Sequence, residues 1–467
     1  MPHLAPVVFA LLAFSADTPP PSDPVAALET ALSDAIAAAE PSVVAIARDI
    51  GKKGEPTVAI RGRFPARPRA IDLDEIPDYI ASDYASGVVI GDRNQILTTA
   101  HAVKGATRLV VRSMGHPDFD AEIIASDPRS DLAVIAPRVG PDQPPLKLKP
   151  IAIAPPSKIR KGSFLLALGN AFNTARDGQA SASWGILANT ARRMNPAQPE
   201  IPNEQQLRHF PSLYQLDAKL NLGMSGGAVI NLKGELIGLT TNAVNAGGFD
   251  VQAGYAIPMD AIARRAIESL REGKEVEYGM LGIGLDNENR TSRIKNVQAG
   301  TPAGEGGLIV DDQILSIGGL PVTDADSLVT TVNNFPPGTP IKLRISREGQ
   351  EMEKTVVLSK LPVFGEVIAT NRSALWRGLR VDFVSVMAGG LRADGVLEAM
   401  ARGGVRIVEV QAGSPADEAG LKPGQIIVGV EDRRVTNPSE FAQAVASLPG
   451  PVTLTLEANQ TVSVPAR

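Results

Sequence analysis

The chain has 467 residues, a length that predicts about three domains at roughly 150 residues each. Apolar residues make up 43% and charged residues 21%, the balance of a folded globular protein, which excludes disorder along the whole chain. The net charge of −5 gives no electrostatic case for nucleic acid binding, and the lack of cysteine excludes disulfides, cysteine nucleophiles and thiolate metal sites.

The histidine spacing bears on cofactors, and the glycine and proline content bears on the fold class. No two of the four histidines (His3, His101, His116 and His209) have the short spacing of a helical metal site, so we expect no metal and no other cofactor. Gly and Pro are plentiful, at 44 and 37 residues, while aromatic residues make up only 4%. This composition predicts a turn-rich, mainly β fold.

The first residues are typical of an export signal. The apolar run at residues 4–14 is too short for a bilayer, which needs about 20 residues. Ala13 and Ser15 are small residues suited to a cleavage site, so we predict a signal peptide over residues 1–15 and a Pro-rich linker over 16–23. The leader lacks Lys and Arg, which leaves an uncleaved anchor or a floppy apolar terminus as the alternative.

The next segment predicts a helix, a strand and a long loop. Asp23 followed by Pro24 is a helix-start signal, and the helix is expected to run to residue 40. Residues 42–50 are rich in β-branched side chains and predict a strand. Residues 51–82 are polar and Pro-rich, which predicts a surface loop long enough to be functional or disordered.

Short apolar runs separated by Gly, Asn and Asp fill residues 86–258. Many short strands with turn signals between them predict a sandwich or a barrel. The strongest strand candidates are residues 87–90, 108–111, 132–135, 164–168, 228–230 and 236–239. A helix is expected over residues 259–272, with Gly273 as its stop signal.

The last third of the chain contains an internal repeat. Residues 297–303 (VQAGTPA) recur at 410–416 (VQAGSPA), and the matches that follow keep the same offset of 113 residues. A constant offset over some forty residues predicts two copies of one domain.

Three motifs of the β-rich region carry candidate catalytic residues. His101 follows an apolar run, Asp131 stands at the mouth of an apolar strand, and Ser225 lies among glycines in a tight loop. A serine hydroxyl needs an adjacent base to take its proton, and an Asp must hold the imidazole in the correct tautomer. The glycines let the backbone N–H groups of Gly223 and Ser225 point at one spot, as an oxyanion hole requires.

Each of these motifs alone has a simpler interpretation. A lone His is more often a loop or core residue, Asp131 suits a strand-starting turn, and glycines around a serine often form only a flexible turn. Together they occur in the chain order His, Asp, Ser within one domain, the order of chymotrypsin-like serine proteases.

With the duplicated C-terminal domain, these motifs resemble the HtrA (Deg) family over nearly everything after residue 24. The resemblance implies a trypsin-like protease domain of two β-barrels at 24–276 and PDZ domains at 277–362 and 374–467. It implies His101, Asp131 and Ser225 as the triad, in the cleft between the barrels. It also implies a homotrimer or larger assembly that degrades misfolded extracytoplasmic proteins, in the periplasm or another exported location.

The chain departs from the family at several positions. Met224 stands where the family usually has Asn, with little effect expected because the backbone shapes the oxyanion hole. Residues 168–178 only loosely match the family's Gly-Asn-Pro-Phe-Gly run, and residues 192–212 are longer than usual. Both segments correspond to loops that control activity in relatives, so these departures put the resting activity in question.

The resemblance also implies a primary specificity pocket. It places Leu220 in the pocket, with Ala243 and Val244 from the following strand. An apolar lining favours a small aliphatic substrate side chain such as Val or Ala. The alternative is that Leu220 and Val244 are ordinary core residues.

Each repeat resembles a PDZ domain, which captures a chain end as an added strand beside a sheet edge and a helix. The expected carboxylate-binding loops are Leu281-Gly282-Ile283 in the first copy and Gly378-Leu379 in the second. The expected groove helices cover 326–334 and 438–447. The second copy carries extra residues at 388–404, so a closed groove that serves only assembly is the alternative there.

The leading hypothesis is therefore a serine endopeptidase for unfolded or damaged extracytoplasmic proteins, regulated by PDZ domains that bind apolar protein C-termini. No nucleotide-binding loop of the Walker type occurs, which agrees with ATP-independent proteolysis. The alternatives are a chaperone or PDZ scaffold whose catalytic site rarely assembles, and a signalling protease activated by peptide.

Overall fold

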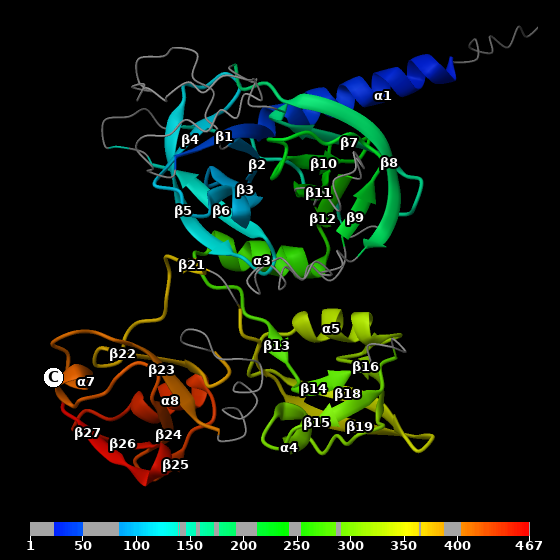
Figure 1. The fold of residues 1–467 in the computed structure, drawn as a ribbon. Helices are drawn as coiled ribbons and strands as arrows, with labels where there is room; N and C mark the ends of the chain where they lie inside the picture. Colours follow the sequence, from blue (N-terminus) through cyan, green and yellow to red (C-terminus); the bar gives the residue numbers. More distant parts are fainter. Residues whose placement is uncertain are drawn as a thin grey trace, which may run out of the picture.

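In the computed structural model, two β-barrels carry two smaller α+β units on one side (Figure 1). The structure describes residues 23–49, 84–138, 140, 146–155, 159–171, 177–192, 213–241, 254–285, 291–363, 366–386 and 403–466. The predicted leader and the whole predicted loop at 51–82 lie outside these residues. Among the described residues, no helix has the length and apolar character needed to cross a bilayer.

The first barrel is built from short strands with buried aliphatic side chains. Its order is β5-β4-β1-β2-β3-β6, closed by pairing of β5 with β6. The strands are β1 Val43–Asp49, β2 Tyr84–Ile90, β3 Gln95–Thr99, β4 Arg108–Arg112, β5 Phe119–Asp127 and β6 Leu132–Pro137. Antiparallel pairing all round leaves no exposed edge in the closed ring, as in other barrels of this size.

The second barrel closes in the order β10-β11-β12-β9-β8-β7. Its strands are β7 Phe164–Gly169, β8 Ser181–Arg192, β9 Leu213–Leu216, β10 Ala228–Ile230, β11 Leu236–Thr241 and β12 Gly254–Pro258. The six strand candidates within residues 86–258 each lie within an observed strand, and the candidate at 42–50 corresponds to β1. The predicted barrel fold is confirmed.

Helices brace the barrels at both ends of this region. Helix α1 (Pro24–Ala39) begins at Asp23, whose side chain accepts a hydrogen bond from the N–H of Val25, and leads through η1 (Glu40–Ser42) into β1. Helix α3 (Ala261–Arg271) begins at Asp260 and buries its apolar stripe in a core shared by both barrels. Both helices lie within two residues of the predicted bounds.

The first repeat packs two helices against short strands. Its elements are β13 Gly279–Met280, β14 Ile283–Leu285, β15 Ile294–Val297, α4 Pro302–Glu305, β16 Gln313–Ile317, β17 Leu320–Pro321, α5 Ala325–Asn333, β18 Pro340–Arg347, β19 Gln350–Val357 and β20 Ser359–Lys360. Helix α5 matches the predicted groove helix, and β14 pairs with β15 alone among the described strands.

The second repeat has the same order of elements in one continuous sheet, β22-β23-β24-β26-β27, with β25 on β24. Its elements are β22 Leu379–Phe383, β23 Val405–Val410, α7 Pro415–Glu418, β24 Ile426–Val430, β25 Arg433–Arg434, α8 Pro438–Val445, β26 Val452–Leu456, η4 Glu457–Asn459 and β27 Thr461–Val464. Most of the extra segment predicted at 388–404 lies outside the described residues.

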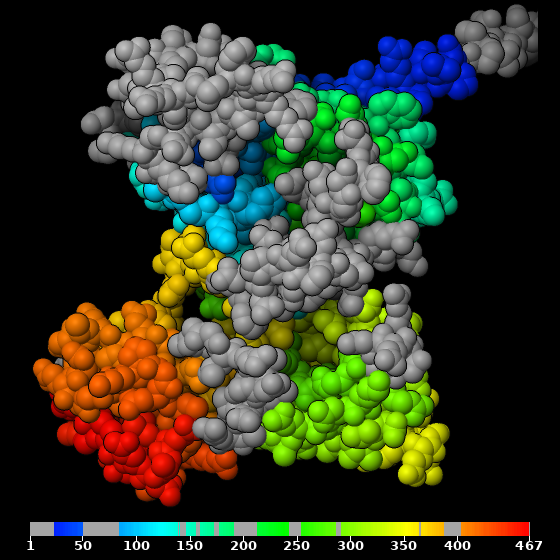
Figure 2. All heavy atoms as spheres, in the orientation of Figure 1, coloured from blue at the N-terminus to red at the C-terminus, as the bar shows by residue number. Residues whose placement is uncertain are grey.

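The chain between the repeats returns to the first barrel. Strand β21 (Ile368–Ala369) pairs with the end of β5, which adds a seventh strand to that sheet. In the space-filling view, this yellow segment rests against the cyan first barrel (Figure 2).

Candidate active site between the barrels

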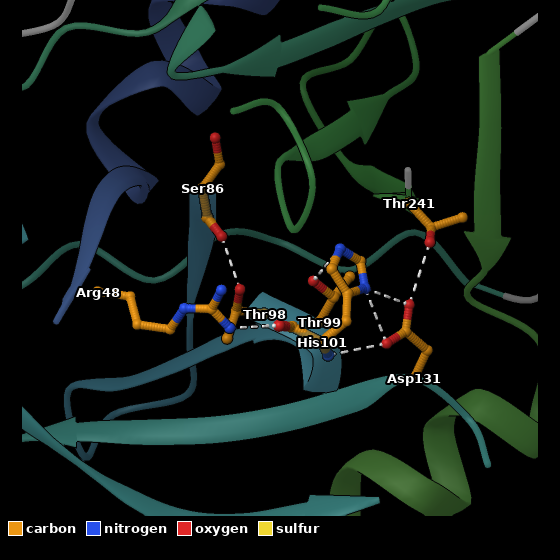
Figure 3. Close-up of polar contacts among 7 residues, drawn as sticks. All are labelled: Arg48, Ser86, Thr98, Thr99, His101, Asp131 and Thr241. Atoms are coloured by element: carbon orange, nitrogen blue, oxygen red, sulfur yellow. Dashed lines mark hydrogen bonds and ion pairs between the residues drawn. The ribbon is translucent and has the colours of Figure 1, made fainter. Parts of the chain in front are cut away.

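His101 and Asp131 lie side by side at the edge of the first barrel. His101 belongs to the short helix α2 (Ala100–Val103) directly after β3, and Asp131 occupies the turn between β5 and β6. The imidazole Nδ1 is 2.9 and 2.8 Å from the two carboxylate oxygens of Asp131 (Figure 3). This contact fits a proton on Nδ1, which leaves Nε2 free to act as a base.

The Asp131 carboxylate is held by groups from both barrels. Its Oδ1 accepts the backbone N–H of His101 at 3.0 Å, and its carbonyl oxygen accepts the N–H of Ala100 at 3.0 Å. Its Oδ2 accepts the hydroxyl of Thr241 at 3.1 Å, from the end of β11 in the second barrel (Figure 3). Sequence reasoning did not single out Thr241, because a polar residue at a strand end gives no local signal of a partner 110 residues away.

Ser225 lies half-buried in a glycine-rich turn before β10. Gly223 and Gly226 adopt left-handed backbone conformations, with φ of 91° and 83°. A Cβ at Gly223 would overlap the carbonyl oxygen of Asn170 and the ring of Tyr84. Only glycine therefore fits this tight turn.

Ser86 ties this turn to the first barrel. It is fully buried in β2, and its N–H donates to the carbonyl oxygen of Ser225 at 2.8 Å. Its hydroxyl donates to the carbonyl of Gly223 at 2.7 Å and accepts the N–H of Asn170 at 2.7 Å. Ser86 was not identified from the sequence, yet it bonds to both proposed oxyanion-hole residues.

Two backbone N–H groups of this turn are candidates for binding an anion. Within the described part of the chain, the N–H groups of Gly223 and Ser225 donate to no protein oxygen, whereas the neighbouring Met224, Gly226 and Gly227 N–H groups all do. Two such donors in one turn are what a tetrahedral oxyanion needs.

His101 and Ser225 are not hydrogen-bonded to each other in this structure. The nearest polar partner of Nε2 among the described residues is the hydroxyl of Thr99, at 3.4 Å. In proteases without substrate, the bond between base and nucleophile is often long and tightens only in the complex. The site therefore contains the groups that acyl transfer requires, without a hydrogen bond between His101 and Ser225.

The predicted pocket residue Leu220 packs against an apolar cluster. Met224 is buried against Ala167 and Ala171, and Leu220 packs beside it. A Cβ on Gly254 would lie 3.0 Å from Leu220 Cγ, so this glycine of β12 leaves room beside Leu220. The predicted pocket residues Ala243 and Val244 lie outside the described residues.

The predicted carboxylate-binding loops of the two repeats make the same backbone contacts. In the first repeat the carbonyl of Leu281 accepts the N–H of Ala303, and Gly282 packs on Thr301 with φ of 75°. In the second repeat the carbonyl of Arg377 accepts the N–H of Ala416, and Gly378 packs on Ser414 with φ of 81°. The structural match supports treating Gly282 and Gly378 as equivalent.

The second loop nevertheless closes on itself. The N–H of Leu379 donates to the carbonyl of Trp376 at 2.7 Å, and the N–H of Trp376 donates back at 2.9 Å. The guanidinium of Arg377, between them, donates to four backbone carbonyls, those of Leu448, Gly450, Val464 and Pro465. A closed hairpin argues against the predicted role of Gly378 and Leu379 in carboxylate binding.

The described residues include no cluster of three or more His, Asp or Glu side chains able to hold a metal ion.

Comparison with known proteins identifies the family. The trypsin-like peptidase domain family matches residues 85–239, and PDZ domain families match residues 279–358 and 406–457. The periplasmic pH-dependent serine endoprotease DegQ of Escherichia coli K12 is 31% identical over 417 residues, covering 86% of this chain and 84% of DegQ. This chain belongs to the HtrA (DegP/DegQ) family of serine endoproteases.

Other members show the same likeness. The periplasmic serine endoprotease DegP of Escherichia coli K12 is 28% identical over 384 residues, covering 80% of this chain and 74% of DegP. The solved structure of the HtrA-type protease AlgW with a decapeptide is 25% identical, with a TM-score of 0.51, and covers 71% of this chain and 98% of its own. The HtrA resemblance, the double barrel and the two PDZ domains expected from the sequence are thereby confirmed.

Proposed function

We propose that this HtrA protein hydrolyses peptide bonds of unfolded or damaged extracytoplasmic proteins, with Ser225 as nucleophile, His101 as general base and Asp131 as the group that orients His101. The observation that carries the assignment is the Asp131 carboxylate bound to His101 Nδ1 and anchored by Thr241 from the other barrel. It leaves Nε2 as the one ring nitrogen able to take a proton.

The chemistry follows from these positions. Nε2 of His101 takes the proton of the Ser225 hydroxyl as the hydroxyl oxygen attacks the substrate carbonyl carbon. The carbonyl oxygen becomes an oxyanion, which the N–H groups of Gly223 and Ser225 stabilise. The imidazolium, stabilised by Asp131, then gives its proton to the leaving amine, and water hydrolyses the acyl-enzyme by the same route.

The proposal also includes substrate specificity, cellular location, domain division and assembly. Leu220, beside Gly254, supports a pocket for small aliphatic side chains.

The relatives DegQ and DegP are named periplasmic, which supports a periplasmic or other exported location for this chain. The matched ranges lie within the proposed domains at 24–276, 277–362 and 374–467, which supports this division of the chain. Helix α1 projects beyond the barrels (Figure 1), with Val25 72% exposed, which supports a role in a homotrimer or larger assembly.

The test is cleavage of unfolded casein by the purified full-length protein, with cut sites mapped by mass spectrometry. We expect cleavage mainly after Val, Ala and similar residues, because the predicted pocket residue Leu220 packs against the apolar cluster of Ala167, Ala171 and Met224. Cuts mainly after Lys or Arg would contradict the apolar pocket. No cleavage under any condition would favour the chaperone or scaffold interpretation.

Peptide binding by the PDZ domains gives a second prediction. Because the second loop is closed by Trp376 and Leu379, the inactive full-length Ser225→Ala protein is expected to bind one apolar C-terminal peptide per chain, at the loop of Leu281, Gly282 and Ile283. Isothermal titration measures the stoichiometry. The same peptide with an amidated C-terminus is the control and is expected not to bind. Two sites per chain would contradict the closed second loop, and no binding would contradict a peptide-binding role for the first.

A further inference from the structure

Tyr278, in the segment between α3 and β13 that we call the first linker, contacts the end of β5, just before the turn that carries Asp131. Its hydroxyl donates a 2.5 Å hydrogen bond to Oδ2 of Asp127, the last residue of β5. Both side chains are buried, with Tyr278 3% and Asp127 1% exposed. Tyr278 lies between α3 and β13, so it stands where the protease domain passes into the first PDZ domain.

Asp127 in turn shapes the start of the Asp131 turn. Its Oδ2 also accepts the N–H of Ser130 at 2.9 Å, and its Oδ1 accepts the N–H of Arg129 at 3.3 Å. Asp131 follows directly in a left-handed conformation, with φ of 54°. A side chain cap of this kind sets the path of the backbone through the turn. The carboxylate of Asp127 thus helps to set the position of Asp131.

The ring of Tyr278 is clamped by two arginines. The guanidinium carbon atoms of Arg129 and Arg265 lie 5.0 and 5.5 Å from the ring centroid, within cation–π range. Arg265 also donates to the carbonyls of Glu277 and Asn333, both at 2.9 Å. Asn333 is the last residue of α5, the groove helix of the first PDZ domain, so this clamp joins that helix to Tyr278.

Burial, together with the Asp127 carboxylate, raises the pKa of Tyr278 well above its ordinary value. The hydroxyl therefore keeps its proton, and remains a donor to Asp127, throughout the neutral and mildly alkaline range.

We propose that Tyr278 is a positioning residue for Asp131, acting through Asp127, and that it couples peptide binding at the first PDZ domain to the catalytic site. The carboxylate-binding loop begins at Leu281, three residues after Tyr278 in the chain. A shift of that loop on peptide binding is transmitted to Tyr278 over a very short segment. The inference rests on the proposed function, in which Asp131 orients His101.

The second inter-domain linker braces the same segment. Strand β21 pairs Ile368 with Ser126 and Ala369 with Ala125, at the end of β5. The N–H and the hydroxyl of Thr370 both donate to the carbonyl of Ile124, at 3.2 and 2.8 Å. Both linkers therefore contact β5, the strand that leads into Asp127. In this proposal, a change in the position of a PDZ domain acts on the protease domain through this strand.

The first test compares the wild type with Tyr278→Phe, which removes one hydroxyl and keeps the ring between the arginines. On a short quenched peptide with an amidated C-terminus, kcat is expected to fall about tenfold, as for loss of a hydrogen bond to a charged group, with KM unchanged. A free C-terminal peptide is expected to bind Tyr278→Phe as tightly as the wild type but to stimulate it less. Tyr255→Phe, on β12 of the second barrel, is the matched control and is expected to behave as the wild type.

A double-mutant cycle tests the route. If Tyr278 acts through Asp127, Tyr278→Phe in the Asp127→Ala background is expected to cause no further loss of kcat. Additive losses, or a Tyr278→Phe protein with unchanged kcat and full peptide stimulation, would overturn the proposal.

A readout that needs no turnover separates this proposal from the proposed function. In protein labelled with ¹⁵N-histidine, the Nδ1–H resonance of His101 reports its hydrogen bond to Asp131, and only four histidines need assignment. Tyr278→Phe is expected to shift or broaden this resonance, while Tyr255→Phe leaves it in place. An inactive wild type would refute the proposed function alone, whereas an unmoved resonance in Tyr278→Phe would refute the positioning role.

Discussion

The Ser225→Ala variant is expected to lower kcat on unfolded casein by about 10⁶-fold, the loss typical when a serine protease loses its nucleophile. Without the hydroxyl no acyl-enzyme forms, and only the oxyanion donors and substrate binding remain to assist water. Because the Ser225 hydroxyl makes no hydrogen bond among the described residues, the free energy of unfolding is expected to change by less than about 0.5 kcal/mol. Initial cleavage rates and thermal unfolding measure the two effects.

Ser163→Ala supplies the control for this loss. Ser163 lies just before β7 on the same barrel, and its replacement is expected to leave the cleavage rate unchanged. If Ser225→Ala cleaves casein as fast as the wild type, another group is the nucleophile and the assignment of Ser225 is wrong.

The second large effect is expected at Lys360, where three segments of the chain meet. Its side chain is 2% exposed, and its Nζ lies 3.0 Å from Glu275, 3.2 Å from Glu277 and 2.7 Å from Asp382. The two glutamates belong to the segment before β13, Lys360 ends the first PDZ domain and Asp382 lies in β22 of the second. The buried Lys360 ammonium therefore links the segment before β13 to β22 of the second PDZ domain.

Lys360→Met is expected to lower the free energy of unfolding of this region by about 3–5 kcal/mol, because it leaves several partly buried carboxylates without their cation. Differential scanning calorimetry of the full-length protein measures the loss. Lys342→Met, an exposed lysine on β18, is the control and is expected to change stability by less than about 0.5 kcal/mol.

The loss at Lys360 is expected to depend on pH. Burial raises the pKa of Glu275 above its ordinary value, against the attraction of Lys360. A carboxyl with a raised pKa binds more protons in the folded than in the unfolded state, so its contribution to stability falls as pH rises through that window. Removing Lys360 raises this pKa further. The deficit of Lys360→Met is therefore expected to be larger at pH 7 than at pH 5, and equal deficits would show that the cluster does not depend on these charges.

Much of this molecule was predictable from local sequence patterns. The alternation of short apolar runs with turn residues predicted a sandwich or a barrel, and the helix-start signal at Asp23 lies at an observed helix cap. The constant offset between the repeats predicted two copies of one domain. These features follow from hydrophobic periodicity, capping and turn chemistry, which act over a few residues and so are written in the local sequence.

The contacts that complete the site were decided only by the tertiary structure. Thr241 reaches Asp131 across 110 residues, Tyr278 reaches Asp127 across 151, and Thr370 reaches Ile124 across 246. Each partner is a common residue in an unremarkable local setting, so no spacing or period marks it. The closure of the two barrels and the return of the linkers onto β5 bring these side chains together. The sequence by itself therefore predicted the catalytic residue types and their family, whereas the packing of distant segments decided what holds Asp131 in place.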